Sequence, residues 1–147
     1  MALRKFNREE EEDKLIQFIL HMSDEEEIFI PNAQRQGYRL DENQSMDSLE
    51  ELERYIHEQK VSFEDPSNEA LLERMNCWYY LGEVVRKNYG GYWRFSMNEE
   101  NTGNWGAYVI DGHCSVPGVE FEPRGLVSVF IGKGCKPGFF RRAIEVV

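Results

Sequence analysis

The stretch PSNEALLERMNCWYYLGEVVRKNYGGYW, residues 66–93, decides the fold of this chain. Asp65 can cap a helix, and the proline that follows it suits the first helical position, where no backbone N–H is needed. The double glycine near the end of the stretch supplies backbone conformations that commonly end a helix. The stretch therefore predicts a long helix from Pro66 to about Tyr89.

This central helix is apolar around much of its circumference. A helix of that kind is buried by neighbours on several sides, so we expect it to form the core of the domain. Glycine in the middle of a helix costs about 1 kcal/mol relative to alanine, and Gly82 therefore predicts that another part of the backbone packs closely there. The main apolar stripe consists of Leu71, Met75, Trp78, Gly82, Val85 and Tyr89.

Aromatic and β-branched runs, separated by turn residues, follow the central helix. They predict four strands, over residues 92–97, 105–110, 116–121 and 126–131. The connections are too short to hold a crossover helix, so sequential strands should pair antiparallel. The apolar spacing in residues 137–147 favours a short final helix over a strand.

Two further helices are predicted before the central one. The first covers residues 8–22 behind an acidic first turn, and its buried stripe should be Leu15, Ile16, Phe18, Ile19 and Met22. The acids of residues 24–27 end this periodicity, residues 28–31 resemble a short extended piece, and residues 32–44 a polar loop. The second helix begins near Asp47 or Ser48, with a buried side of Leu49, Leu52, Tyr55 and Ile56.

These elements predict a single α+β domain over residues 1–147. It consists of an acidic helical part, residues 1–65, and a part with the core helix and sheet, residues 66–147. The N-terminal helices and the long central helix should pack on a mainly antiparallel sheet of about four strands.

The net charge of the chain lies entirely in its first part. Residues 1–65 contain 18 acidic and 8 basic side chains, whereas residues 66–147 contain 9 of each. A one-sided negative field attracts basic proteins and repels nucleic acid and anionic lipid. The sequence pI near 4.8 thus favours a basic protein partner and excludes nucleic acid and membranes as partners; a homodimer stays open.

Three cysteines indicate a reducing compartment. Cys77, Cys114 and Cys135 cannot all pair within one chain and show no CxxC spacing. The longest apolar run near the start is interrupted by polar residues and follows acids instead of bases, so we expect neither a signal peptide nor a membrane span. The expected location is the cytoplasm.

The candidate catalytic motifs all have a plainer interpretation. Neighbouring side chains on an extended chain point apart, so His113 and Cys114 make a poor nucleophile and base, and a buried cysteine beside a surface histidine is the simpler reading. A zinc site made of His113, Cys114 and Cys135 would lack a fourth soft ligand at the usual spacing. The glycines of residues 132–134 lack the residues of a phosphate-binding loop. We therefore expect no catalytic residue, no metal and no cofactor.

Other side chains remain open to two interpretations. Glu83 and Arg86 on the central helix are either a buried acid with its partner or the flanks of the apolar stripe. The three tryptophans would suit nucleotide stacking in a basic protein, but in this acidic chain they are core residues or interface anchors.

The segment from Tyr80 to Arg86, followed by Tyr89-Gly90-Gly91-Tyr92-Trp93, resembles a block found in small bacterial α+β proteins. Some of these belong to the immunity-protein groups of polymorphic and contact-dependent toxin systems. The resemblance covers residues 69–131 and does not reach the acidic first part. It implies a cytoplasmic, non-enzymatic inhibitor of a bacterial toxin.

The leading hypothesis is therefore an immunity-type protein whose acidic surface covers the basic cleft of a toxin, most plausibly a nuclease. A housekeeping or structural domain is the alternative, and a small hydrolase with buried carboxylates is a third. The predicted partner-binding residues are the acids Asp24, Glu25, Glu26, Glu27, Asp41 and Glu42, with Phe29 and Tyr38 as aromatic anchors between them.

Overall fold

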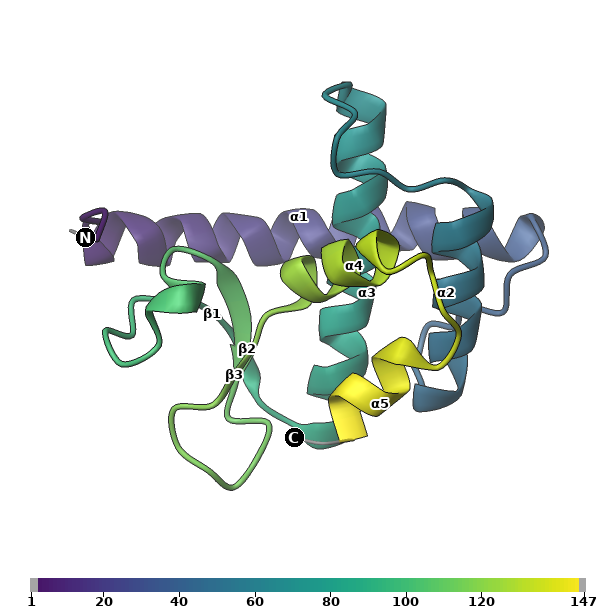
Figure 1. Cartoon of the computed structure of the whole chain (residues 1–147). Helices are drawn as coiled ribbons and strands as arrows, with labels where there is room; N and C mark the ends of the chain where they lie inside the picture. The colour runs from purple at the N-terminus through teal and green to yellow at the C-terminus, as the bar shows by residue number, and fades with distance from the viewer. Residues whose placement is uncertain (1–2, 146–147) are drawn as a thin grey trace.

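The computed structural model describes residues 3–145 and has an α+β fold, which confirms the predicted class (Figure 1). The α-helices are α1 Arg8–Arg35, α2 Leu49–Glu58, α3 Asn68–Tyr89, α4 Pro123–Gly132 and α5 Phe139–Glu145. The strands are β1 Tyr92–Phe95, β2 Tyr108–Asp111 and β3 Glu120–Phe121, and the 3-10 helices are η1 Met46–Ser48 and η2 Thr102–Asn104.

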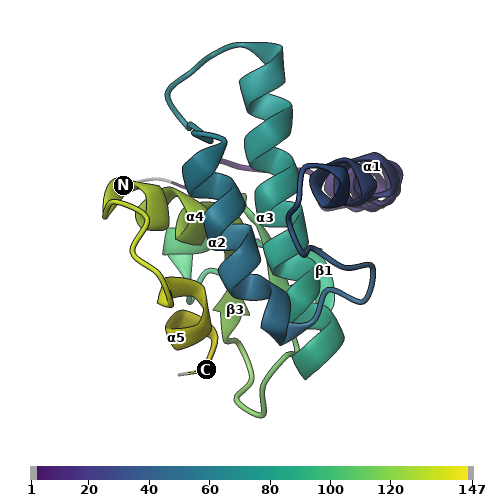
Figure 2. The ribbon, with the colours of Figure 1, turned by 90° about the vertical axis from the view of Figure 1, so that its right-hand side faces the viewer.

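Helix α3 is the predicted central helix. Its cap is Ser67, whose side chain accepts a backbone hydrogen bond of 3.1 Å from the first turn, so the helix starts two residues later than predicted. Gly90, at φ +91°, ends it. The middle of the predicted stripe is buried, whereas Leu71 and Tyr89 at its two ends are each 43% exposed. Figure 2 shows why the centre is buried: α3 lies between α1 on one side and α2, α4 and α5 on the other.

The predicted close contact at Gly82 is confirmed, although the neighbour is a side chain and not a backbone. The indole of Trp93 on β1 lies so close that a Cβ at residue 82 would overlap it. The indole N–H of Trp93 donates a 3.1 Å hydrogen bond to Glu83, which also accepts from Arg86. Glu83 is only 6% exposed, so the pair is a buried acid with its partner.

Helix α1 is nearly twice as long as predicted. Its 28 residues continue through the acidic run and through Pro31, so residues 28–31 are helical and not extended. An internal proline removes one hydrogen bond and costs about 3 kcal/mol. Phe29, Ile30 and Ala33 around it are all buried, and burial of large apolar side chains is worth roughly 1.5–3 kcal/mol each, which offsets the break.

The sheet has three strands and not about four. All pairings are antiparallel in the order β1-β2-β3, with Trp93 opposite Ile110 and Ile110 opposite Phe121. Residues 126–131, predicted as the fourth strand, belong to α4. The side chain of Glu122 accepts a hydrogen bond from the first turn of α4, and Pro123 follows at a favoured helical position, so helix-start signals overrode the β-branched composition.

One hydrophobic cluster connects the acidic first part of the chain to the rest. It includes buried side chains of all five α-helices together with β-strand residues. The predicted buried side of α2 is confirmed, with Leu49, Leu52, Tyr55 and Ile56 each at most 5% exposed. The carboxylate of Glu53 on α2 accepts hydrogen bonds of 2.8 Å from Gly138 N and 3.0 Å from Phe140 N, which fixes the start of the predicted final helix α5.

Within residues 3–145, no helix combines the length and the apolar content that crossing a membrane requires.

Candidate functional site

The four predicted acids of residues 24–27 lie in the middle of α1. Asp24 and Glu27 are exposed, whereas Glu25 and Glu26 are half-buried. Successive residues of an α-helix are about 100° apart around its axis, so Asp24 and Glu26 point in nearly opposite directions. The predicted acidic set therefore does not form a single face.

Glu26 connects α1 to the loop between α1 and η1. The side-chain amide of Gln44 donates a 2.9 Å hydrogen bond to Glu26 Oε1. Burial raises the pKa of Glu26 to about 7. Gln44 is fully buried, and its Oε1 has no hydrogen-bond partner within residues 3–145. Glu26 is therefore engaged in an internal contact.

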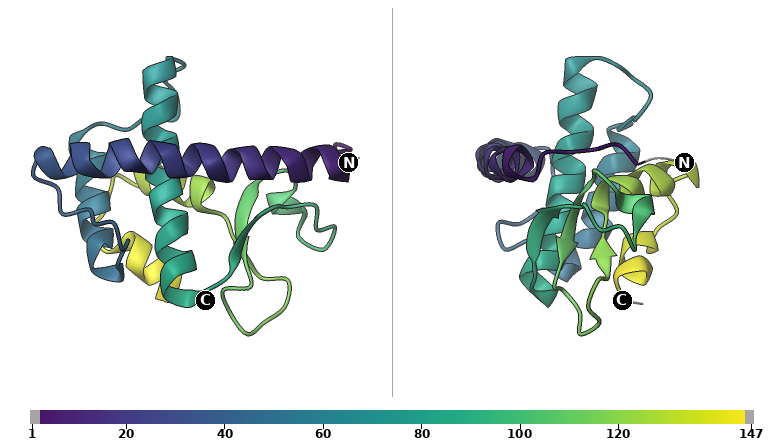
Figure 3. Two further views of the ribbon diagram at one scale, coloured as in Figure 1. Left: turned by 180° about the vertical axis from the view of Figure 1, so that it is seen from behind. Right: turned by 90° about the vertical axis from the view of Figure 1, so that its left-hand side faces the viewer.

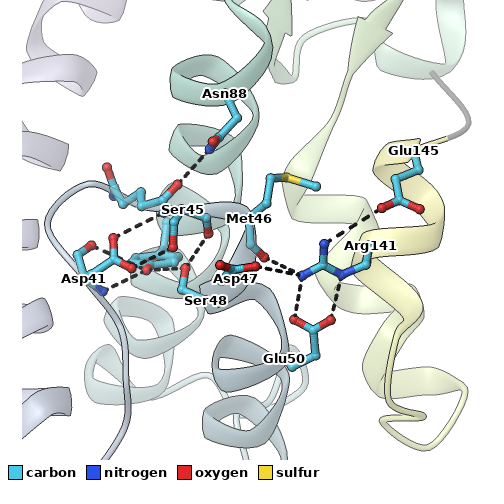
Figure 4. Close-up of polar contacts among 11 residues, drawn as sticks. Asp41, Ser45, Met46, Asp47, Ser48, Glu50, Asn88, Arg141 and Glu145 are labelled. Carbon is cyan, nitrogen blue, oxygen red and sulfur yellow. Dashed lines mark hydrogen bonds and ion pairs between the residues drawn. The ribbon is translucent and has the colours of Figure 1, made fainter.

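The two other predicted acids lie in the same loop, where α3 holds the backbone. Lys87 Nζ donates to the Glu42 carbonyl at 3.1 Å, and the Asn88 amide donates to the Gln44 carbonyl at 2.9 Å. The Asp41 carboxylate accepts from Ser45 N at 3.2 Å and from Ser45 Oγ at 2.8 Å (Figure 4). Asp41 is therefore engaged in its own turn, and the side chain of Glu42 is exposed.

Arg141 of α5 neutralises acids farther along this segment. Its guanidinium donates to Glu50 at 2.7 Å and to the Met46 carbonyl at 2.9 Å, and lies 3.9 Å from Asp47 and 3.8 Å from Glu145 (Figure 4). These contacts attach α5 to η1 and the start of α2. The acids near Arg141 thus contribute less to an attractive field than the sequence suggests.

A hollow of about 510 Å³ lies beside this loop and has side chains of both signs. Arg54 on one side donates to Glu51 at 2.9 Å and stacks on Tyr38, with its Cζ 4.4 Å from the ring centroid. The Arg54 contact holds the pKa of Glu51 at about 2. Because Arg39 and Arg54 line it together with three acids, this hollow is not the acidic surface that the charge pattern predicts.

Phe29 and Tyr38 are core residues, each 5% exposed, and cannot serve as exposed anchors. Both rings lie edge-on to Tyr55, with centroid distances of 5.2 and 4.9 Å. The Tyr38 hydroxyl donates a 2.9 Å hydrogen bond to Glu58. Phe29 belongs to α1 and Tyr38 to the loop after it, and both rings pack against α2. Neither ring lies on a surface together with the acids that flank it in the sequence.

The outward face of α1 carries a different set of residues. Ile16 and Leu20 are 56% and 55% exposed. The prediction that Ile16 is buried is therefore wrong, and so is the same prediction for Ile19, which is 38% exposed. Exposed acids lie on the same face at both ends of this apolar pair. At spacings of three and four, the face runs Glu9, Asp13, Ile16, Leu20, Asp24, Glu27. We call these six residues the α1 stripe. Seen from behind, α1 lies in front of the rest of the molecule along its whole length (Figure 3, left).

Sequence reasoning missed the apolar half of the α1 stripe. It assigned Ile16 to the same buried face as Phe18, because both lie within one helical turn of other apolar residues. Two interleaved faces are present instead: Phe18, Met22 and Phe29 point inward, and the stripe points outward. The regular spacing of acids at positions 9, 13, 24 and 27 was the available signal, since it marks the solvent side.

The histidine and cysteine pair differs from its expected arrangement. His113 is 6% exposed, and Cys114 is only half-buried. Burial lowers the pKa of His113. Cys77 is the fully buried thiol, and burial raises its pKa. Within residues 3–145, no three histidine, cysteine or acidic side chains gather closely enough to hold a metal ion.

None of the protein-family models, curated proteins or solved structures compared with the chain matches it.

Proposed function

We propose that this chain is an immunity-type binding protein that captures a basic bacterial toxin of the nuclease class through the α1 stripe. The observation that supports the proposal is the order of side-chain types along the stripe. An exposed pair of large aliphatic side chains lies between two pairs of exposed acids on one uninterrupted helix face.

The apolar pair supplies the contact that would hold the complex together. Exposed isoleucine and leucine side chains scattered singly are ordinary on protein surfaces. Ile16 and Leu20 are adjacent on one face and more than half exposed, and desolvated contacts near the centre of an interface contribute most of its binding energy. A partner with a complementary apolar spot would bury both side chains at once.

The flanking acids specify the sign of the charge on the partner's surface. Helix α1 contains nine acidic and three basic side chains, and in the α1 stripe only acids flank the apolar pair. Rim charges of one sign speed association with a surface of opposite sign. A nuclease has a basic cleft because its substrate is a polyanion, so an acidic helix laid across that cleft would also exclude the substrate.

Co-expression with the toxin encoded beside its gene tests the proposal. The intact chain should restore growth of cells that make the toxin. A variant with Ile16→Ser, Leu20→Ser, Asp24→Lys and Glu27→Lys should not restore growth, although it should accumulate to the same level, since these side chains are exposed.

Val116→Ser is the matched control. Val116 is 59% exposed, but it lies in the loop between β2 and β3 and not on α1. Cells with this control should grow as with the intact chain. Full protection by the four-residue variant would exclude the α1 stripe as the binding surface, and absence of any toxin gene beside this one would remove the immunity assignment itself.

A further inference from the structure

A second hollow, of about 360 Å³, lies between the loop that contains η2 and the start of α4. Its walls combine aromatic rings with one carboxylate. Trp78 comes from α3, Trp105 and Tyr108 from the loop and β2, and Glu122 from the position that caps α4. Arg124 in the first turn of α4 is the basic residue at this hollow.

The rings are fixed before any ligand arrives. The ring of Phe18 stacks on Tyr108, with centroids 4.0 Å apart, and on Trp78, with centroids 5.8 Å apart. The indole N–H of Trp105 donates a 2.6 Å hydrogen bond to the Arg4 carbonyl. Each ring is therefore held by a contact outside the hollow, and such preorganisation lowers the entropy that binding would cost.

Glu122 forms no close ion pair within residues 3–145, although the positive charge of Arg124 acts on it and partly offsets the effect of burial on its pKa. Its Oε2 accepts a 2.7 Å hydrogen bond from Gly125 N, but none of the ion pairs formed within residues 3–145 includes this carboxylate. The Arg124 guanidinium extends over Phe63 instead, with its Cζ 5.5 Å from the ring centroid. Burial raises the pKa of Glu122. A positively charged group in the hollow would lower this pKa again.

We propose that this hollow binds an alkylammonium group, supplied either by a free small molecule or by a lysine side chain of another protein. The faces of indole and phenol rings attract cations, and an unpaired carboxylate beside them adds a direct charge interaction. The site lies on elements other than the α1 stripe and does not depend on the proposed function.

The same lining argues against hydrolysis at this hollow. A carboxylate-dependent hydrolase uses a second acid or a nucleophile beside the first. Among the described residues that line the hollow, Glu122 is the one acid, and serine, cysteine and histidine do not occur. Its chemistry thus fits recognition of a cation better than cleavage of a bond.

Titration of the full chain with choline tests the proposal. At pH 8, choline should shift the NMR signal of the Trp105 indole N–H and change tryptophan fluorescence. The uncharged analogue, in which carbon replaces the quaternary nitrogen, should bind at least about five-fold more weakly, because it keeps the shape and loses the charge.

Three variants assign the effect to the hollow. Glu122→Gln keeps a side-chain oxygen for Gly125 N and should weaken choline binding about five-fold, and Trp105→Leu should do the same. Arg124→Gln removes the neighbouring positive charge and should strengthen binding. Tyr92→Leu, which removes a 56% exposed ring elsewhere, is the control and should leave affinity unchanged. Urea unfolding confirms that each variant is folded.

A second experiment identifies the source of the cation. The probe is a short peptide with one lysine, compared with the same peptide acetylated on Nζ. Binding of the lysine peptide in preference to choline would indicate a protein side chain, and the reverse would indicate a free small molecule. Equal binding of choline and its uncharged analogue, or no Trp105 shift with any cation, would overturn the proposal.

Discussion

The two faces of α1 have similar side chains and opposite environments. Phe18 and Met22 on the inner face are at most 8% exposed, whereas Ile16 and Leu20 on the outer face are more than half exposed. The inner face packs against α3 and β1. The outer face has no neighbouring element over it in the views of Figures 2 and 3.

This difference shows that apolar content alone does not say which side of a helix is core. Phe18 on the inner face is fixed by aromatic contacts with Trp78, Tyr79, Trp93 and Tyr108. The outer residues have acids as neighbours along the helix instead. The inner face should therefore determine stability, and the outer face should be free to bind another molecule.

The largest expected effect is that of Phe18→Ala on stability. Removal of a buried phenylalanine ring costs about 3–5 kcal/mol, since it loses apolar contacts and leaves a cavity. Leu20→Ala on the outer face should change the free energy of unfolding by less than about 0.5 kcal/mol. Urea unfolding of both variants measures the two values. Similar losses for both variants would mean that the outer face is also packed.

A somewhat smaller effect on stability is expected from a change of pH, through Glu26, which lies between the inner and outer faces of α1. Because its pKa is raised to about 7 in the folded chain, from an ordinary 4.5, the folded state binds the proton more tightly than the unfolded state. The stability that this group contributes is therefore complete below about pH 4.5 and is lost as the pH rises through 7. The loss amounts to at most about 3 kcal/mol.

Glu26→Gln tests this linkage. The variant keeps the hydrogen bond with Gln44 and removes the charge, so it should be more stable than the intact chain at pH 8, with a gap that closes toward pH 5. Glu27→Gln, one residue away and exposed, is the control and should show no such gap. Urea unfolding at the two pH values gives the measurement; a gap of the same size at both would exclude the raised pKa.

The smallest expected effect is on the rate of association. Asp24→Lys with Glu27→Lys should slow binding of a basic partner about ten-fold at low salt and weaken the dependence of the rate on salt. Exposed charges contribute little to folding, so the unfolding free energy should stay nearly constant. Stopped-flow mixing at two salt concentrations measures the rate. An unchanged rate would place the docking surface elsewhere.

Local signals were enough to predict much of the fold. The proline, the apolar spacing and the terminal glycine predicted α3, although its cap is Ser67 and not Asp65. The buried side of α2 and the helical conformation of α5 followed from spacing. Tertiary burial decided the exceptions. Pro31 is tolerated in α1 because Phe29 and Ala33 are buried around it. Residues 126–131 are β-branched and aromatic but follow a capping acid and a proline, and they became α4.

Less of the candidate site than of the fold could be predicted from the sequence. Asp24 and Glu27 were predicted to be exposed and are, whereas Glu26 faces Gln44, because helical geometry turns it away. The acidic neighbours of Phe29 and Tyr38 in the chain predict both to be surface anchors, and this prediction is wrong. Phe29 lies seven residues after Met22, on the same face, so continuing the inner stripe past the acidic run would have placed it in the core.

The most direct test of the two-face account is the affinity of the double variant Ile16→Ala, Leu20→Ala for the proposed toxin partner. Loss of two central apolar contacts should weaken binding at least about thirty-fold, which corresponds to 2 kcal/mol. Val116→Ala, which changes an equally exposed residue in the loop between β2 and β3, should leave the affinity unchanged, and both variants should unfold at the same urea concentration as the intact chain. An unchanged affinity in the double variant would contradict the assignment of the α1 stripe as the binding surface.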